Sequence, residues 1–538
     1  MAGGVDFYST AIAMSGAAPP TYIIPQGDKR RVQAYWTYEN LYDNLPEAVV
    51  AVLRDISGDE KSRRMIPAAR TLIEATNRYL GVDPALIVPA AGQLPPGVTP
   101  PTDEVVTAAI GYLNAFFARE QVVAKLLSLK RWMLIHGDRL LHITADPTKA
   151  EGTRVSLHEI SAESYFPIHD RMDSERVSGC YLVNVIEVDG DEIVQRLEYQ
   201  KIRTPDDQAK YGAPVGSVWT RLSFWEVDGW DDRDEMGMTP EDLKPAETVP
   251  AWAGSEEAKL LLAGMVMPAQ ITTIPVYHYR NGRRGSSAFG VSEIQGVESL
   301  IAGISQTATD EDLTVVLQGV GVYWTTSGKP RNDAGQEVDW EISPAAMLEL
   351  EQGTAVGRLQ GATDIQSLLQ HKAMMEQAAR DGIGTPDIAI GAFLPGNSAA
   401  ESGVALAIRF APVLAKNAEK ELELTGVTNQ LLFDLINGWF PAYEGMQWPG
   451  VIIQLGFSDP LPVDRTATME EIIAMVTAKI ISLEVARKLI AEKLGYQFPD
   501  DMDTQVTTEA ASLVDATAPR LDAAVADGAD AADGASVL

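Results

Sequence analysis

The fold is decided by the stretch GVSEIQGVESLIAGISQTATDEDL, which runs from Gly290 to Leu313. We expect a helix to begin at Ser292, because a serine side chain caps the free amide groups of a first turn, and Glu293 then places a carboxylate near the positive end of the helix dipole. Apolar residues recur here at intervals of three and four and so share one helix face: Ile294, Val297, Ile301, Ile304 and Ala308. That face requires a packing partner.

The next residues predict a β-structured tip and a second helix. From Thr314 to Trp324 the chain is rich in β-branched, aliphatic and aromatic residues, which favour strands, and turn residues follow from Ser327 to Gly335. A second helix is expected from about Thr363 to Arg380, ended by Gly382 and Gly384. Its predicted inner face consists of Ile365, Leu368, Leu369, Lys372, Met375 and Ala379. Two helices joined through a β-tip therefore form a hairpin.

A loop and a third helix come next. Proline and glycine are frequent between Ile383 and Ser402, so we expect a mobile loop there. A helix from Ser402 to about Leu424 should be kinked by Pro412. Its expected buried residues are Leu406, Phe410, Val413 and Leu414, and Lys416 and Lys420 are expected on its solvent face.

The flanking regions predict a mixed α+β protein. Residues 1–30 form an expected arm, helices are expected between Val32 and Leu80, and Val105 to Lys130 reads as one long helix. Short β-like runs predict an antiparallel sheet: Leu140 to Thr144, Val155 to Ile160, Gly179 to Val188, Ile193 to Gln200, Val218 to Val227 and Ile271 to Tyr279. After a strand from Val451 to Gly456, two short helices are expected, Met469 to Lys479 and Leu483 to Leu494, before an Ala- and Asp-rich tail.

Composition restricts the classes of function. The 538 residues carry 43 Lys and Arg against 75 Asp and Glu, a formal charge of −32, which opposes tight binding to a phosphate backbone. The single cysteine, Cys180, is expected to be a small core residue. We expect neither a secretory signal nor a membrane span.

No phosphate-binding loop, dinucleotide-binding glycine motif, nucleophile elbow or zinc-protease motif occurs, so we predict no catalytic residue and no cofactor.

Three groups of residues could in principle bind a metal ion or act in catalysis. They are the histidines His136, His142, His158 and His169, the acidic loop from Asp231 to Asp242, and the adjacent acids Asp310, Glu311 and Asp312. The histidines lack paired ligand spacing, the loop lacks the alternation of a calcium loop, and adjacent helical acids point in different directions. We therefore predict structural or solvated roles for all three groups and no metal site.

At these residues the sequence resembles the portal proteins of tailed, siphovirus-like bacteriophages. The matching segments are IPVYHYRNGRRGSSAFGVSEIQGVESLIAGISQTATDEDL from Ile274, ARDGIGTPDIAIG from Ala378 and ESGVALAIRFAPVLAKNAEKEL from Glu401. Weaker matches lie at Leu129 to Asp146 and Glu163 to Asp170. The resemblance covers most of the chain through patterns of glycine, proline and apolar spacing.

The resemblance implies an α+β portal subunit with a wing, stem helices, a β-containing clip, a tunnel loop, a long kinked helix and a helical crown. Its implied divisions are an arm at 1–30, wing at 31–290, first stem helix at 291–312, clip at 313–362, second stem helix at 363–383, tunnel loop at 384–401, long helix and return to the wing at 402–460, crown at 461–500 and a flexible acidic tail at 501–538.

It also implies a ring, expected to hold twelve copies, at one capsid vertex of the virion, assembled in the host cytoplasm. Double-stranded DNA would pass through the ring during packaging and ejection without sequence specificity. The implied partners are the terminase large subunit, a head–tail adaptor, and the major capsid and scaffolding proteins. A carboxylate- or metal-dependent hydrolase and another virion connector, such as an adaptor or a capsid-fused protein, remain the alternatives.

The expected DNA channel and tunnel-loop residues are Lys372, Arg380, Pro386, Phe393, Leu394, Pro395 and Asn397. The expected clip contacts are Lys329, Arg331 and Trp340.

Overall fold

The computed structural model divides into two compact units, residues 1–460 and 461–538. It describes residues 26–53, 63–89, 100–170, 176–226, 245–282, 287–320, 322–326, 336, 355–359, 366–391, 403–458 and 465–494. The expected arm, acidic loop and acidic tail lie largely or wholly outside these residues.

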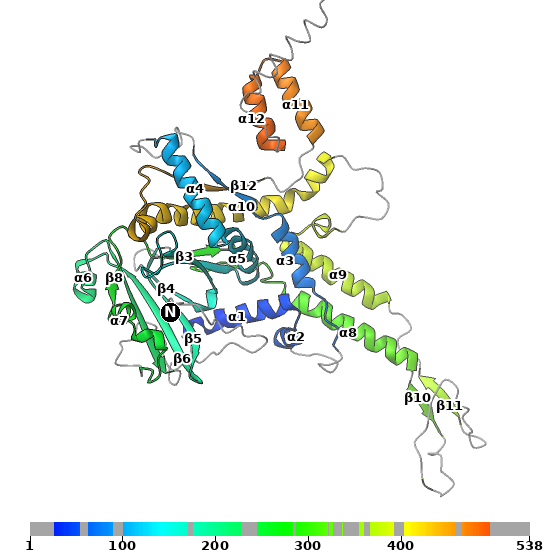
Figure 1. The fold of residues 1–538 in the computed structure, drawn as a ribbon. Coiled ribbons are helices and arrows are strands. Elements are labelled where there is room, and N and C mark those ends of the chain that lie inside the picture. Colours follow the sequence, from blue (N-terminus) through cyan, green and yellow to red (C-terminus); the bar gives the residue numbers. More distant parts are fainter. Residues whose placement is uncertain are drawn as a thin grey trace, which may run out of the picture. The chain divides into compact units, whose positions relative to one another are not determined.

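Helices and strands alternate irregularly along the first unit, as an α+β fold requires (Figure 1). Its helices are α1 (Gln26–Asp43), α2 (Pro46–Val52), α3 (Ala68–Arg78), α4 (Asp103–Arg119), α5 (Val122–His136), α6 (Pro205–Tyr211), α7 (Glu256–Ala263), α8 (Glu298–Val320), α9 (Gln366–Ile383) and α10 (Gly403–Asp434). Short 3-10 turns are η4 (Ala162–Ser164), η6 (Ala251–Gly254) and η7 (Asp387–Ile390), and η8 (Leu435–Glu444) is a π-helix.

Within the described ranges, four antiparallel sheets accompany these helices. The strands are β1 (Val82–Ile87), β2 (Asp138–Ala145), β3 (Val155–Ile160), β4 (Tyr165–His169), β5 (Val177–Val188), β6 (Asp191–Lys201), β7 (Val218–Glu226), β8 (Met265–Val266), β9 (Val276–Arg280), β10 (Val322–Thr325), β11 (Val356–Leu359) and β12 (Gln454–Ser458). They pair in the orders β3-β2-β9, β4-β5-β6-β7-β8, β1-β12 and β10-β11.

The expected β region is therefore divided between two sheets rather than forming one. Strand β3 has the predicted bounds, and the turn between β5 and β6 contains Asp189 and Gly190, both with positive φ, as a tight hairpin requires. Cys180 is buried on β5, in the main core, as predicted. Burial raises the pKa of its thiol, with a further contribution from Glu198, so the thiol stays protonated.

The expected long helix from Val105 to Lys130 is wrong, because the chain breaks between α4 and α5. Gln121 adopts a left-handed conformation with φ 52°, which turns the chain before Val122. Helix α5 then buries Leu126, Leu129, Met133 and its neighbours in the main core, which also includes residues of both larger sheets, α10 and η8.

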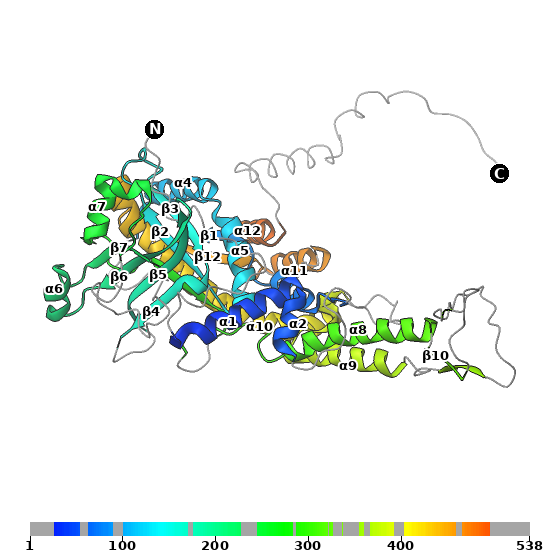
Figure 2. The same cartoon turned by 90° about the horizontal axis from the view of Figure 1, so that it is seen from below.

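Helices α8 and α9 lie side by side and run antiparallel (Figures 1 and 2). The strand pair β10-β11 follows α8, with Val322 opposite Leu359 and Thr325 opposite Val356. A helical hairpin and a β-tip are thus both present in the described residues. We call α8, α9 and this strand pair the stem hairpin.

Two bounds in the stem hairpin differ from the sequence prediction. Helix α8 begins at Glu298 and not at Ser292, and it continues to Val320 through residues that were expected to be a strand. Ile294 and Val297 are nevertheless buried, as are Ile301, Ile304 and Ala308. The predicted apolar face is therefore real, although its first two residues lie in the turn that precedes the helix.

Helix α10 continues through Pro412 to Asp434 and then into η8, in agreement with the helix expected to about Leu424 and with the helical continuation expected from Thr425 to Phe440. The second unit contains α11 (Arg465–Thr477) and α12 (Leu483–Leu494), close to the two helices expected there. Ile472 and Ala486 are buried between or beside them. Among the helices the structure describes, none has the length and apolar character needed to cross a membrane.

Candidate functional site

The candidate site is the stem hairpin and the residues that hold its base. Gly303 on α8 faces Met375 on α9, and a Cβ atom at Gly303 would lie 3.1 Å from the Met375 sulfur. The two helices consequently approach closely at this level, where a larger side chain would separate them. Further along, Lys372 Nζ lies 3.3 Å from Glu311 Oε2 and joins α9 to α8.

The predicted inner face of α9 is only partly correct. Ala379 and Ile383 are buried, and Leu368, Lys372 and Met375 are half-buried. Leu369 was placed on this face but is exposed. Because an α-helix has 3.6 residues per turn, residue 369 points away from α8 when residues 368, 372, 375 and 379 face it.

The base of the hairpin is a packed turn, not the mobile loop expected to start at Gly384. Gly384 takes φ +70°, and Pro386 then precedes η7, whose Ile388 and Ala389 are buried. Ala389 packs in a small core with Ala75 of α3 and Val413 of α10. The residues from 392 to 402, which include Phe393, Leu394, Pro395 and Asn397, lie outside the described part of the chain.

The two bases predicted to face a channel are both engaged within the subunit. Lys372 is half-buried in its pair with Glu311, and Arg380 Nε lies 2.8 Å from Asp387 Oδ1 while its Nη2 donates to Gln377. Pro386 is half-buried at the start of η7. Lys329, Arg331 and Trp340, the predicted clip contacts, lie outside the described residues.

Helix α8 carries acids and no base. Its ionisable residues are Glu298, Asp310, Glu311 and Asp312. The last three point to different partners: Asp310 accepts from Gln306, Glu311 pairs with Lys372, and Asp312 pairs with Arg64 at 2.9 Å. The three acids therefore point in different directions, as expected for adjacent residues of a helix.

Large apolar side chains are exposed on all three long helices of this region. They are Val315 on α8, Leu369 and Met374 on α9, and Ile408, Leu422 and Phe433 on α10. Met374 and Leu422 are 71% and 76% exposed, values that are typical of charged side chains rather than of Met or Leu. Apolar side chains with this degree of exposure are candidates for contact with another subunit.

A buried ionic cluster fastens the base of the hairpin to α10. Lys416 Nζ lies 2.5 Å from Glu293 Oε1, and Lys420 Nζ lies 2.8 Å from Glu293 Oε2. Lys420 also donates to Asn281 Oδ1, and Asn281 Nδ2 donates to Val291 O at 2.7 Å. We call Glu293, Lys416, Lys420 and Asn281 the base cluster.

The base cluster also holds the end of α9. Lys416 donates to the carbonyl of Ile383, the last residue of α9, at 2.9 Å. A cation at this position stabilises the negative end of a helix dipole. Burial alone would raise the pKa of Glu293, but Lys420 and Lys416 outweigh burial and hold that pKa below its ordinary value. Burial lowers the pKa of Lys416, an effect that Glu293 opposes.

The base cluster was not predicted from the sequence, since both lysines were expected on the solvent face of α10 and Glu293 in a helix that in fact begins later. One signal was available. Lys420 lies on the same stripe as Val413, Asn417 and Leu424, all of which are buried. A lysine within a buried stripe requires a buried acidic partner.

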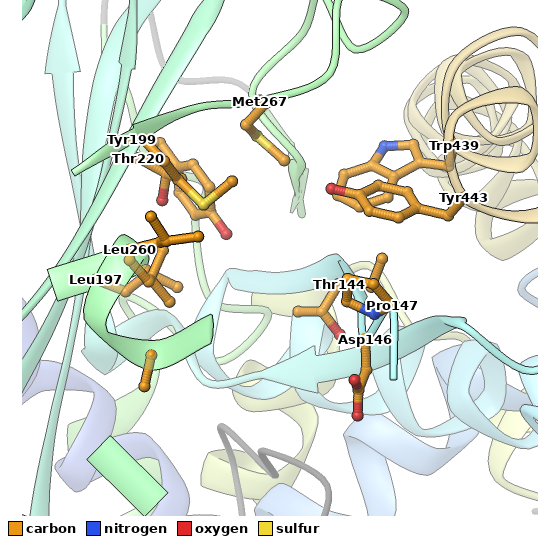
Figure 3. A pocket seen from close by; sticks show the side chains of 14 residues that line it. Thr144, Asp146, Pro147, Leu197, Tyr199, Thr220, Leu260, Met267, Trp439 and Tyr443 are labelled. Atoms are coloured by element: carbon orange, nitrogen blue, oxygen red, sulfur yellow. The ribbon is translucent and has the colours of Figure 1, made fainter. Parts of the chain in front are cut away.

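A cavity of about 200 Å³ lies elsewhere in the first unit, among β6, β7, α7 and η8 (Figure 3). Its labelled lining residues are mostly apolar or aromatic, with Trp439 and Tyr443 on one side and Leu197, Tyr199 and Leu260 on the other. Asp146 is the single acid among the lining residues, and its Oδ1 accepts from Thr148. This cavity therefore offers no paired acid and base for catalysis.

Of the four histidines considered from the sequence, His142 and His158 lie opposite each other in the β2–β3 pair, whereas His136 lies at the end of α5 and His169 on β4. His142 Nε2 lies 2.8 Å from the Tyr199 hydroxyl and is buried, which lowers the pKa of His142 well below its ordinary value. His158 bonds with Thr144 across the β2–β3 pair. His136 lies instead at the end of α5, beside two glutamates.

No protein-family model and no curated protein sequence matches the chain. Solved structures that are similar include a chain from the virion of a native gene transfer agent (GTA) particle, with 12% identity, a TM-score of 0.39, and coverage of 85% of this chain and 93% of that chain. Two others come from the neck of the native GTA particle computed with C12 symmetry (11% identity, TM-score 0.36, 79% and 89% coverage) and the neck of the empty particle computed with C6 symmetry (12% identity, TM-score 0.38, 79% and 90% coverage). TM-scores this low do not by themselves establish a shared fold or function.

Proposed function

We propose that this chain is a portal subunit of a tailed-phage-like virion. Many copies would stand side by side as a ring, with the stem hairpins forming the wall of a channel for double-stranded DNA. The observation that carries the proposal is the stem hairpin itself, whose helices expose Val315, Leu369 and Met374 to solvent in a single subunit. A neighbouring copy would cover such side chains and remove their apolar surface from water.

The charge of the hairpin agrees with a channel through which DNA slides. Helix α8 presents acids without a base, and the two bases of α9 are each paired with an acid of the same subunit. A wall of this kind offers DNA no strong phosphate-binding site, which permits passage without sequence specificity. Terminase, a head–tail adaptor, and capsid and scaffolding proteins would be the partners of the assembled ring.

Mass photometry and negative-stain microscopy of the purified full chain test the proposal. The proposal expects closed rings, with twelve copies as the expected number. A monodisperse monomer over a wide range of protein concentration would contradict it. A monomer with hydrolytic activity that depends on a divalent ion would support the hydrolase alternative, and an assembly of another symmetry would support a different connector.

A matched pair of variants tests whether the stem hairpin makes the ring contact. Val315 on α8 and Val215, which follows α6, are both 52% exposed. Val315→Lys inserts a charge into the proposed contact and should reduce ring formation by about tenfold or more, whereas Val215→Lys makes the same change in charge and should leave it unaltered. Equal ring formation by both variants would place the subunit contact elsewhere.

A further inference from the structure

We propose that Glu39, His136 and Glu163 form a binding site for a divalent transition-metal ion of the zinc class. The three residues come from separate elements: Glu39 from α1, His136 from the end of α5, and Glu163 from η4. One possible ligand atom of each lies within 4.8 Å of the other two. The proposal does not depend on the portal function.

His136 is the residue that points to a ligand. Its side chain is 2% exposed, and neither ring nitrogen has a hydrogen-bond partner. A buried imidazole without hydrogen bonds costs free energy, because it loses the water that would otherwise satisfy its nitrogens. A metal ion bound to Nε2 would recover part of that cost.

The spacing fits coordination better than hydrogen bonding. His136 Nε2 lies 3.4 Å from Glu39 Oε2, and this pair does not meet hydrogen-bond geometry. Two ligand atoms bound to zinc at about 2.1 Å in a tetrahedral arrangement are about 3.4 Å apart. The separation between His136 and Glu39 therefore equals that of two ligands of one ion, and the ligand atom of Glu163 lies within 4.8 Å of both.

Two aromatic rings hold the imidazole in position. Tyr35 stacks on His136 with ring centroids 5.2 Å apart and an angle of 24° between the rings, and Trp132 lies at 5.2 Å and 45°. These contacts restrict rotation of the His136 side chain, so the direction of Nε2 is set before any ion arrives. A site arranged in advance binds with a smaller loss of side-chain entropy.

The charges around the site favour a cation. Glu39 and Glu163 place two carboxylates beside His136, and one ligand atom of each of the three residues lies within 4.8 Å of the other two. Two arginines, Arg31 and Arg139, also interact with Glu163, but each is paired directly with another acid, Arg31 with Asp28 and Arg139 with Glu159. Glu39 is about one-third exposed, so solvent reaches one side of the site.

The ligand set selects the class of ion. One imidazole nitrogen and two carboxylates suit Zn²⁺, Co²⁺ or Mn²⁺, whereas Ca²⁺ and Mg²⁺ prefer oxygen ligands alone and Cu⁺ prefers sulfur. Three protein ligands leave one position for water. Binding would join α1, α5 and the turn that leads from β3 to β4.

The experiment measures Zn²⁺ binding by isothermal titration calorimetry and metal analysis on the full chain after removal of metals with a chelator. Glu39→Gln keeps size and helix propensity at a partly exposed position, so it should fold normally, and it should weaken the site by more than about tenfold. Asp43→Asn, one turn further along α1 and outside the group, is the matched control and should bind like the unchanged protein. His136→Asn should abolish the site.

The outcomes separate the possibilities. One Zn²⁺ per chain in the unchanged protein and in Asp43→Asn, with weakened binding in Glu39→Gln, would support the site. Equal binding by all the variants would show that Zn²⁺ occupies other acidic groups, and no uptake would show that His136 is only an ion-pair partner of the glutamates. Either result overturns the proposal, and Glu39→Gln decides the matter even if His136→Asn does not fold.

Discussion

At the scale of single residues, Glu293 has the largest expected effect on stability, because one buried carboxylate serves two lysines. Glu293→Gln leaves Lys416 and the buried Lys420 without their counter-charge, so it should lower the free energy of unfolding by about 3–5 kcal/mol. Urea unfolding at neutral pH measures this loss. Glu419→Gln, an exposed position on α10, is the control and should change stability by less than about 0.5 kcal/mol.

The same residue predicts how stability depends on acid. Since folding lowers the pKa of Glu293, its stabilising contribution is complete above its unfolded pKa of about 4.3 and is lost as the pH falls through the lower folded value. The difference in stability between the unchanged protein and Glu293→Gln should therefore shrink on acidification below about pH 4. A difference that stays constant into strong acid would show that the carboxylate charge is not what stabilises the base cluster.

At the scale of elements, two glycines in helices should respond oppositely to the same change. A Cβ atom at Gly382, near the end of α9, would lie 2.7 Å from Val297, whereas one at Gly426, within α10, would meet nothing within 4 Å. Gly382→Ala should destabilise the protein by about 1–3 kcal/mol through overpacking. Gly426→Ala should stabilise it by about 0.5–1 kcal/mol, since alanine favours a helix. Thermal unfolding of the two variants compares them, and stabilisation by both would mean that the base of the hairpin is loosely packed.

Elements with a regular local pattern could be predicted from the sequence. Strand β3, helix α12 and the apolar face that includes Ile301 and Ile304 follow from periodicity alone. The start of α8 could not be predicted, because Ser292 donates to the Ile135 carbonyl and Glu293 N donates to the Leu134 carbonyl at 2.8 Å, so both residues are bound to the end of α5. The continuation of α8 to Val320 also runs against the preference of β-branched residues for strands. Tertiary packing can override that preference.

The pairings within the candidate sites also could not be predicted from the sequence. The sequence placed Lys372 near the stem, but its partner Glu311 is 61 residues away along the chain. Lys416 and Glu293 are 123 residues apart, and Glu39 reaches His136 only because α1 packs on α5. Pairings across such separations depend on the tertiary fold, which single-sequence periodicity does not contain. The channel roles of Lys372 and Arg380 stay predictions.

At the scale of the whole molecule, the formal charge of −32 should control assembly. Identical acidic subunits repel one another, whereas the apolar contacts proposed here are not weakened by salt. Ring formation should therefore increase as NaCl rises from about 10 mM to about 100 mM, over which the screening length falls from about 30 Å to about 10 Å. Mass photometry across this range of NaCl measures the fraction of subunits that form rings. A loss of rings with added salt would show that ion pairs, rather than apolar side chains, hold neighbours together.

Lys416 binds the last carbonyl of α9 and the carboxylate of Glu293 through the same ammonium group. A tilt of the two stem helices would pull on this group, and the strain would pass into α10 and from there into the sheet packed against it. One ammonium group therefore connects three segments of the chain: the end of α9, the turn that precedes α8, and α10. Movement of the stem helices relative to α10 would have to break these bonds or displace α10 as well.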